Sequence, residues 1–460
     1  MENEYSKKIN YYNKILKKYS YHVDFFKTAN IMMENMPENI NLQNKIIYLN
    51  STMVTAPTLI SYVLYILKNA KEKKIKKLYF LARDGYIMHK IAVILCEKYN
   101  INIECRYLYC SRLVLRAPLY LINRGEAIEK ICEEGAKISI EIVLKRAGIS
   151  NDIQNNILNE LDEEFKNKFL TKKDLNKLKT ILLNNKLFNE YAYEYAKDKY
   201  NDIFEYFKQE KLFEEKKYAI VDVGWLGTMQ RHIREILQYS GYKNNMNGYY
   251  FGMFENGRYE DGEYNCFYFS KEKNSSRRAF FNNNLFECMC SANHGMTIGY
   301  SKDTAGFIKP VLKQYENKWN VNIQLNIVEK FCEKFSILNQ WNEISFNYLD
   351  LMVKRLIISF MVFPNKEEAS IYGSIPFCDD FTESYKIKLA QRLTKQELYQ
   401  YNMFYKIYKK LFFIKNSNKF NESFWINGSI QVSDVKYKKI FNLGCILSEY
   451  IHYLIIHNLN

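Results

Sequence analysis

Two short apolar runs, each ended by a glycine-containing turn, constrain the fold of this chain most. The first, LYFLA (residues 78–82), is broken at residues 83–85 before apolar residues return at helical spacing. The second, YAIVDV (residues 218–223), is broken at residues 224–228 and is followed by another helical pattern. Runs of this length and composition are typical of strands buried on both faces. We therefore predict two strand–turn–helix units and a parallel sheet.

Further strands are predicted at residues 103–109, 248–254 and 266–270. Charged and apolar residues mix at helical period between the two parts of this sheet and again after it, so the fold class is α/β with helical additions. We divide the chain into an N-terminal helical segment (1–44), the first part of the α/β core (45–124), a helical insertion (125–215), the second part of the core (216–311) and a helical C-terminal domain (312–460).

The composition predicts a cytoplasmic protein. No window reaches the roughly 18 uninterrupted apolar residues of a membrane span, and the nearest, residues 56–67, is too short. The N-terminus lacks the charged-then-apolar pattern of a signal peptide. The ten cysteines are scattered without CxxC pairs or zinc-ligand spacing, so we expect reduced thiols.

The formal net charge of +15 has two explanations that the sequence leaves open. A basic chain suits an acidic partner, such as a phosphorylated substrate, a nucleic acid or an anionic membrane surface. Lys, Asn, Ile, Tyr and Phe also share A/T-rich codons, so genome composition alone can supply the excess of lysine.

Both turns should lie at the carboxyl ends of neighbouring strands, where open parallel sheets bind ligands. Asp84 and Asp222 would face this crevice, and a carboxylate there can hold Mg²⁺ or a sugar hydroxyl. The segment GTMQ (residues 227–230) offers a hydroxyl and the first amides of a helix, which suit a phosphate group. The alternative is that each aspartate merely caps its helix.

Two more segments add candidate residues. In YLYCSRLVLRAP (residues 107–118), Arg112 and Arg116 are four apart and would share one face of a helix, where guanidinium groups can bind phosphate. In FECMCSANHGMTIGY (residues 286–300), Glu287 and His294 are candidate general bases. The alternatives are a solvated basic face and a structural histidine.

Taken in order, FLARDGY, YLYCSR, VDVGWLGTMQ and the SANHG–TIGY segment resemble a family of bacterial proteins from surface-polysaccharide clusters. Its members are identified as predicted hydrolases of the haloacid dehalogenase (HAD) superfamily. In longer relatives a genuine HAD phosphatase domain is fused to a region similar to this one, which looks like a phosphoribosyltransferase-type module with a Rossmann-like parallel sheet. The resemblance covers roughly residues 45 to 310.

The resemblance implies Mg²⁺-dependent transfer of a 5-phosphoribosyl group from phosphoribosyl pyrophosphate (PRPP) to an acceptor glycan, free or lipid-linked, with release of pyrophosphate. A separate HAD phosphatase would then remove the 5-phosphate. Such a protein would contact the inner face of the membrane at most peripherally.

The resemblance also implies a role for each turn. Arg83 and Gly85 would bind pyrophosphate, Asp84 and Asp222 would hold Mg²⁺, and the general base would be Asp84, Glu287 or His294. The ribose 5-phosphate would lie against the second turn, formed by Gly224, Trp225, Gly227, Thr228, Met229 and Gln230. The sequence departs from the usual PRPP signature because Asp222 is followed by Val223 instead of a second acid.

Two other functions compete with this hypothesis. A HAD-type phosphatase acting on a phosphosugar needs a second Asp two residues after its nucleophile, but Gly224 stands two residues after Asp222. A non-catalytic scaffold or RNA-binding module would suit the lysines and tyrosines. The chain has no recognised RNA-binding signature, so we expect no nucleic-acid partner.

Overall fold

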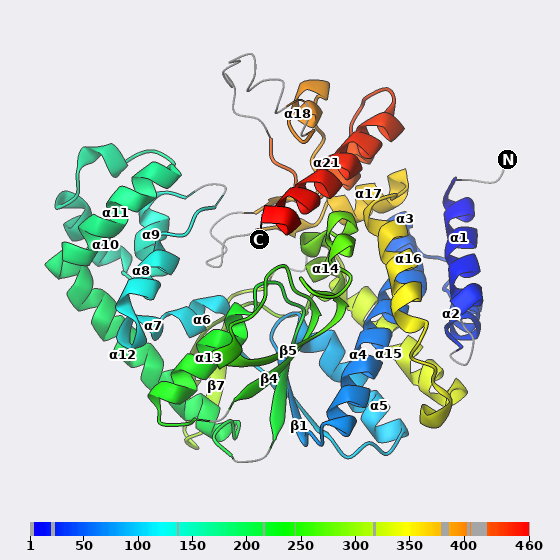
Figure 1. Ribbon diagram of the computed structural model, residues 1–460, viewed down its shortest axis with the longest axis horizontal. Helices are drawn as coiled ribbons and strands as arrows, with labels where there is room; N and C mark the ends of the chain where they lie inside the picture. The colour runs from blue at the N-terminus through cyan, green and yellow to red at the C-terminus, as the bar shows by residue number, and fades with distance from the viewer. Residues whose placement is uncertain are drawn as a thin grey trace.

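The computed structural model describes residues 4–19, 24–135, 138–214, 217–243, 245–315, 319–378, 386–402, 405 and 421–459. Its five central strands are β1 (Lys77–Leu81), β2 (Glu104–Leu108), β3 (Tyr218–Asp222), β4 (Met246–Gly252) and β5 (Gly262–Phe269). They form one all-parallel sheet in the order β2-β1-β3-β4-β5 (Figure 1). The prediction of an α/β fold with a parallel sheet is confirmed, and all five predicted strands are present within a few residues of their expected bounds.

This strand order places a topological switch point between β1 and β3. From β1 the chain passes through α5 (Gly85–Lys98) to β2 on one side, whereas β3 and α13 (Thr228–Tyr239) continue to β4 on the other side. In open parallel sheets the connections diverge at such a point, and ligands bind in a crevice beyond the carboxyl ends of the two strands. Both turns found in the sequence lie at these strand ends.

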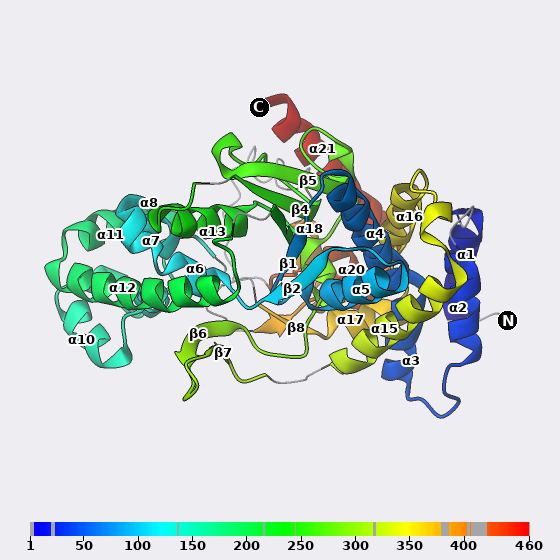
Figure 2. The ribbon, with the colours of Figure 1, turned by 90° about the horizontal axis from the view of Figure 1, so that it is seen from below.

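Alternate residues of the sheet enter two different hydrophobic cores. Leu78 and Phe80 of β1 pack in the core that includes α4 (Ala56–Glu72) and α5. Tyr79 and Leu81 pack in the core that includes α13 and α12 (Lys186–Gln209). Figure 2 shows these two pairs of helices on opposite sides of the sheet. The continuous apolar run in the sequence follows from this burial on both faces.

The N-terminal helices cover one side of the core: α1 (Glu4–Tyr19), α2 (Phe25–Glu34) and α3 (Leu42–Asn50). The π-helix η1 (Ser51–Thr55) joins α3 to α4 without a break. Pro57 stands in the first turn of α4, and the preceding π-turn continues the helix despite the missing proline N–H.

The continuous helix of residues 42–72 is long and apolar enough to cross a membrane by length and composition alone. We did not predict this from the sequence. The apolar window is wholly buried inside the protein, and its residues form part of the main core, so it serves as a core helix of this fold.

The helical insertion has a hydrophobic core of its own, which includes Leu144, Phe165 and Leu178. Its helices, with the short ones that lead into it, are α6 (Arg112–Arg116), α7 (Leu119–Ile122), α8 (Arg124–Ile131), α9 (Ile140–Arg146), α10 (Asn151–Asn159), α11 (Lys172–Asn184) and α12. Figure 1 shows α8 to α11 projecting from one side of the sheet.

After β5 the chain forms α14 (Asn283–Met289) and an antiparallel pair that we did not predict, β6 (Thr297–Lys302) and β7 (Ile308–Leu312). The remainder is mostly helical, as predicted. It consists of α15 (Val321–Leu338), α16 (Leu349–Met361), α17 (Lys366–Gly373), the short pair β8 (Pro376–Phe377) and β9 (Ile387–Lys388), α18 (Lys395–Tyr399), α20 (Ile426–Val432) and α21 (Lys438–Leu459).

Candidate active site

Neither aspartate at the switch point caps a helix. Asp84 occupies the N-cap position of α5, but its side chain accepts no capping hydrogen bond. Asp222 ends β3, while the N-cap position of α13 is Gly227. One carboxylate oxygen of Asp222 accepts a hydrogen bond from the adjacent Val223 N–H at 2.8 Å. The structure therefore favours the interpretation that both carboxyl groups face the crevice.

A third carboxyl group joins them from α14. The indole N–H of Trp225 donates to Glu287 Oε1 at 2.8 Å, which orients this side chain. The ring of Trp225 packs in turn against Phe254, Phe281 and Phe286. We predicted Trp225 to contact substrate, but in the structure it anchors Glu287.

The three carboxyl groups influence one another strongly. Burial raises the pKa of Asp84 well above its usual value, and the negative charges of Glu287 and Asp222 raise it further. Burial is also the main reason that the pKa of Asp222 rises to about 7 and that of Glu287 rises. Perturbed acids that gather in a crevice are typical of functional sites.

Two guanidinium groups oppose this repulsion. The charges of Arg83 and Arg112 lower the pKa values of Asp84 and Glu287, and Arg112 also lowers that of Asp222. Arg112 is exposed and has no hydrogen-bond or ion-pair partner among the described residues. The predicted grouping of Arg83, Asp84 and Asp222 with Glu287 and Arg112 is therefore present in the structure.

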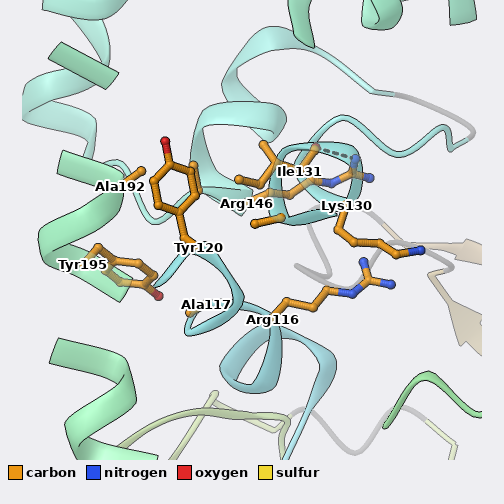
Figure 3. A pocket seen from close by; sticks show the side chains of 10 residues that line it. Arg116, Ala117, Tyr120, Lys130, Ile131, Arg146, Ala192 and Tyr195 are labelled. Carbon is orange, nitrogen blue, oxygen red and sulfur yellow. Dashed lines mark hydrogen bonds between the residues drawn. The ribbon is translucent and has the colours of Figure 1, made fainter. Parts of the chain in front are cut away.

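Arg116 shares α6 with Arg112, but its guanidinium is engaged by the helical insertion. Its guanidinium donates to Glu133 at 2.9 Å, and the side chain is largely buried. Figure 3 shows it beside Lys130 and Arg146 in a pocket between α6 and the helical insertion. Our prediction that Arg112 and Arg116 bind phosphate together is not supported, because Arg116 is buried and paired with Glu133 whereas Arg112 is exposed.

The turn before α13 has the predicted backbone but not all of the predicted contacts. Gly227 has φ +67°, and a Cβ atom there would collide with the Tyr264 ring. Gln230 is fully buried, donates to Met246 O and Asp261 O, and accepts from Tyr250. The side chain of Gln230 is thus part of the core and is not available to a ligand.

The first residues of α13 remain available to a ligand. Thr228 is partly exposed at the first helical position, whereas the side chain of Met229 packs against the core. Thr228 can therefore offer its hydroxyl and its amide, but Met229 can offer only its amide. A helix N-terminus of this kind attracts anions through free N–H groups and its partial positive charge.

The other two glycines allow close packing of the turns. A Cβ atom on Gly224 would collide with the carbonyl oxygen of Gly252, and its φ is +142°. A Cβ atom on Gly85 would lie 2.9 Å from the carbonyl carbon of Phe80. Both glycines are therefore required by the backbone, whether or not they contact a ligand.

His294 lies near Arg83, but both of its ring nitrogens are engaged. Nδ1 lies 2.9 Å from Gly295 O, so Nδ1 carries the proton, and Nε2 then accepts a hydrogen bond from the Tyr107 hydroxyl at 2.8 Å. Burial lowers the pKa of His294, so the ring is neutral. As a base it would have to give up the bond from Tyr107, which makes it a weaker candidate than the carboxylates.

We did not predict from the sequence that three tyrosine rings surround His294. The rings of Tyr86, Tyr107 and Tyr109 all pack against the imidazole. Tyr107 lies in β2 and Tyr109 directly follows the last residue of this strand, and their ring centroids are 4.9 Å apart. Their spacing was visible in YLYCSR and could have indicated that these tyrosines line the crevice.

The carboxyl groups fit a magnesium ion. Within the described ranges, no group of three or more His, Cys, Asp or Glu side chains could hold a metal ion by itself, so substrate and water would have to supply the other ligands. Mg²⁺ usually takes one or two carboxylates together with substrate phosphates and water. Asp84 and Asp222 follow adjacent strands and repel each other, so a cation between them would relieve an unfavourable interaction.

Comparisons with known proteins give no independent identification. No protein-family model matches the chain, and no curated protein matches it.

Proposed function

We propose that the protein transfers a 5-phosphoribosyl group from PRPP to a hydroxyl group of an acceptor glycan. The observation that carries this proposal is the site at the switch point, where three carboxyl groups and two guanidinium groups meet beside the N-terminus of α13. A PRPP site must bind the 5-phosphate in one place and the pyrophosphate, together with a cation, in another. The two turns supply these features on adjacent strands.

The reaction assigns a distinct task to each part of the site. The bond between C1 of the ribose and the pyrophosphate oxygen breaks, and the acceptor hydroxyl oxygen bonds to C1. Bound Mg²⁺, held by Asp84 and Asp222, would neutralise charge on the leaving group. Arg83 and Arg112 add fixed positive charge, and the first amides of α13 with the Thr228 hydroxyl hold the 5-phosphate.

Glu287 is our choice for the general base. It comes from α14, and the indole N–H of Trp225 in the second turn fixes one of its oxygens. Burial raises the pKa of this carboxyl group toward neutral pH. A general base is most effective when its pKa lies near the working pH. The proton of the acceptor hydroxyl would pass to the other carboxylate oxygen.

A HAD-type phosphatase is less compatible with this geometry. That chemistry needs an acidic side chain two residues after Asp222, and a side chain on Gly224 would collide with Gly252 O. The proposed product still carries a 5-phosphate, so a separate phosphatase would complete the modification.

Calorimetry with PRPP tests the proposal. We expect binding in the presence of Mg²⁺ and much weaker binding without it. Arg83→Ala and Asp222→Asn should each weaken binding at least tenfold, equivalent to about 1.4 kcal/mol. Arg124→Ala is the matched control, because Arg124 is an exposed arginine on α8 in the insertion.

Binding that is absent, or equally strong in all of these variants, would contradict the proposal. Hydrolysis of phosphosugars that depends on Asp222 would support the phosphatase instead. Salt-sensitive binding of RNA that is unaffected by Arg83→Ala would support the RNA-binding module.

A further inference from the structure

The last described helix, α21, has an unusual distribution of side chains. Its surface carries large apolar residues that are 37% to 67% exposed, namely Ile440, Leu443, Leu447, Tyr450 and Leu454. The side toward the protein carries Asn442, Cys445 and Ser448, which are about 5% exposed or less, and Phe441 and Ile446, which pack against the cores. A surface helix normally keeps polar residues on its outer face. The additional exposed apolar stripe indicates that another apolar surface covers α21.

The buried face fixes the orientation of α21. Asn442 donates to the Val362 carbonyl at 2.8 Å, and the Tyr453 hydroxyl lies 2.9 Å from Ser275 Oγ. Tyr450 also contacts the ring of Phe280 at the edge of its exposed stripe. Since these contacts hold the helix, it cannot rotate to bury the apolar stripe. In Figure 2, α21 lies at the edge of the molecule, where a partner can reach it.

The spacing of the stripe indicates the type of partner. Positions 440, 443, 447, 450 and 454 follow the alternating three- and four-residue intervals of a helix that packs against another helix. A stripe with this spacing complements a second stripe with the same spacing. It is also nearly symmetric about Leu447, because Ile440 and Leu454 each lie seven residues from it.

We propose that α21 forms a homodimer interface in which two copies of the helix pack antiparallel about a two-fold axis near Leu447. Two-fold dimers are the most common oligomers, and their interfaces join identical surfaces. In this arrangement Ile440 faces Leu454 of the partner subunit. The proposal is independent of the proposed reaction.

The charges of α21 favour this partner over a membrane surface. Lys438 and Lys439 begin the helix, so in an antiparallel pair they approach the negative end of the facing helix dipole. A helix that lies on an anionic membrane instead carries basic residues along its polar face. The exposed flank of α21 has Glu449 and His452 along its middle.

Mass measurement of the full chain in solution is the test. The chain has a mass of 55.1 kDa, and light scattering after size exclusion should give twice this value at micromolar concentration. Leu447→Glu and Leu447→Lys should each give the monomer, because like charges would meet near the axis. An equimolar mixture of these two variants should restore the dimer, because opposite charges then face each other.

The control is Leu42→Glu, which places the same charge on α3 at a leucine that is 62% exposed. It should remain dimeric, and circular dichroism should show that all variants retain the native helix content. A monomeric wild type, dimeric single variants, or a mixture that stays monomeric would each overturn the proposal. A monomeric wild type that binds anionic vesicles through Leu447 would assign the stripe to a membrane instead.

Discussion

At the scale of single residues, Asp222 shows how burial and charge shape the site. Its side chain lies almost entirely out of water at the end of a buried strand, and its pKa rises to about 7. The Val223 N–H and the charge of Arg112 favour its ionised form, while burial and Glu287 disfavour it. A neutral or half-ionised Asp222 repels a phosphate less than a full charge would, and it can still bind a cation.

This raised pKa predicts a pH-dependent stability. In the unfolded chain Asp222 loses its proton near pH 4, but in the folded protein it keeps the proton up to about pH 7. The folded state therefore binds more protons between these values, and Asp222 makes stability fall as pH rises through this interval. Asp222→Asn should remove that loss and raise the free energy of unfolding at pH 8 by on the order of a few kcal/mol.

Denaturant unfolding of both proteins at pH 4 and pH 8 measures this difference. Asp174→Asn is an informative control, because hydrogen bonds from Thr171 in a helix-capping box lower the pKa of Asp174. It should therefore lose stability at pH 8. An Asp222→Asn effect that is equal at both pH values would show that Asp222 ionises normally.

At the scale of elements, the two ends of α13 illustrate what a glycine contributes. Gly227 before the helix and Gly241 after it both have positive φ angles, of +67° and +88°. Their surroundings differ, because Gly227 faces the Tyr264 ring and Gly241 has no atom nearby. The sequence predicted this helix and its final glycine, but it could not reveal the steric constraint at the start.

Gly227→Ala and Gly241→Ala should therefore differ in their effects. Both lose about 1 kcal/mol because alanine disfavours a positive φ. Gly227→Ala should lose at least a further 1 kcal/mol from overpacking against Tyr264, and it should weaken PRPP binding because the turn must move. Thermal unfolding and calorimetry of the pair measure both effects, and equal losses of stability would contradict the steric argument.

At the scale of the whole molecule, the helical insertion is a separate packing unit beside the α/β core. Its hydrophobic cluster extends from Leu119 to Ala196, whereas Ile203 and Phe207 of the same helix α12 pack beneath the sheet. One long helix thus connects the two cores. Independent cores of this kind often open independently.

Leu178→Ala should test this division, because Leu178 is fully buried in the insertion. The lost packing should cost about 2–5 kcal/mol locally. Hydrogen exchange should accelerate in α8 to α11 and remain unchanged in β1 to β4. Leu78→Ala in β1 is the matched control and should accelerate exchange in the sheet. Faster exchange everywhere in Leu178→Ala would show that the two cores unfold together.

Local hydrophobic patterns and glycines were enough to predict the strands, the turns after β1 and β3, and the parallel sheet. They also located Asp84 and Asp222 at the correct edge. Which other residues reach that edge depends on how the elements pack. Glu287 is held by a hydrogen bond from Trp225, which lies 62 residues earlier in the chain. Arg116 instead pairs with Glu133, and the side chain of Gln230 is buried in the core. Contacts across such separations depend on how whole elements pack, and no local pattern encodes them.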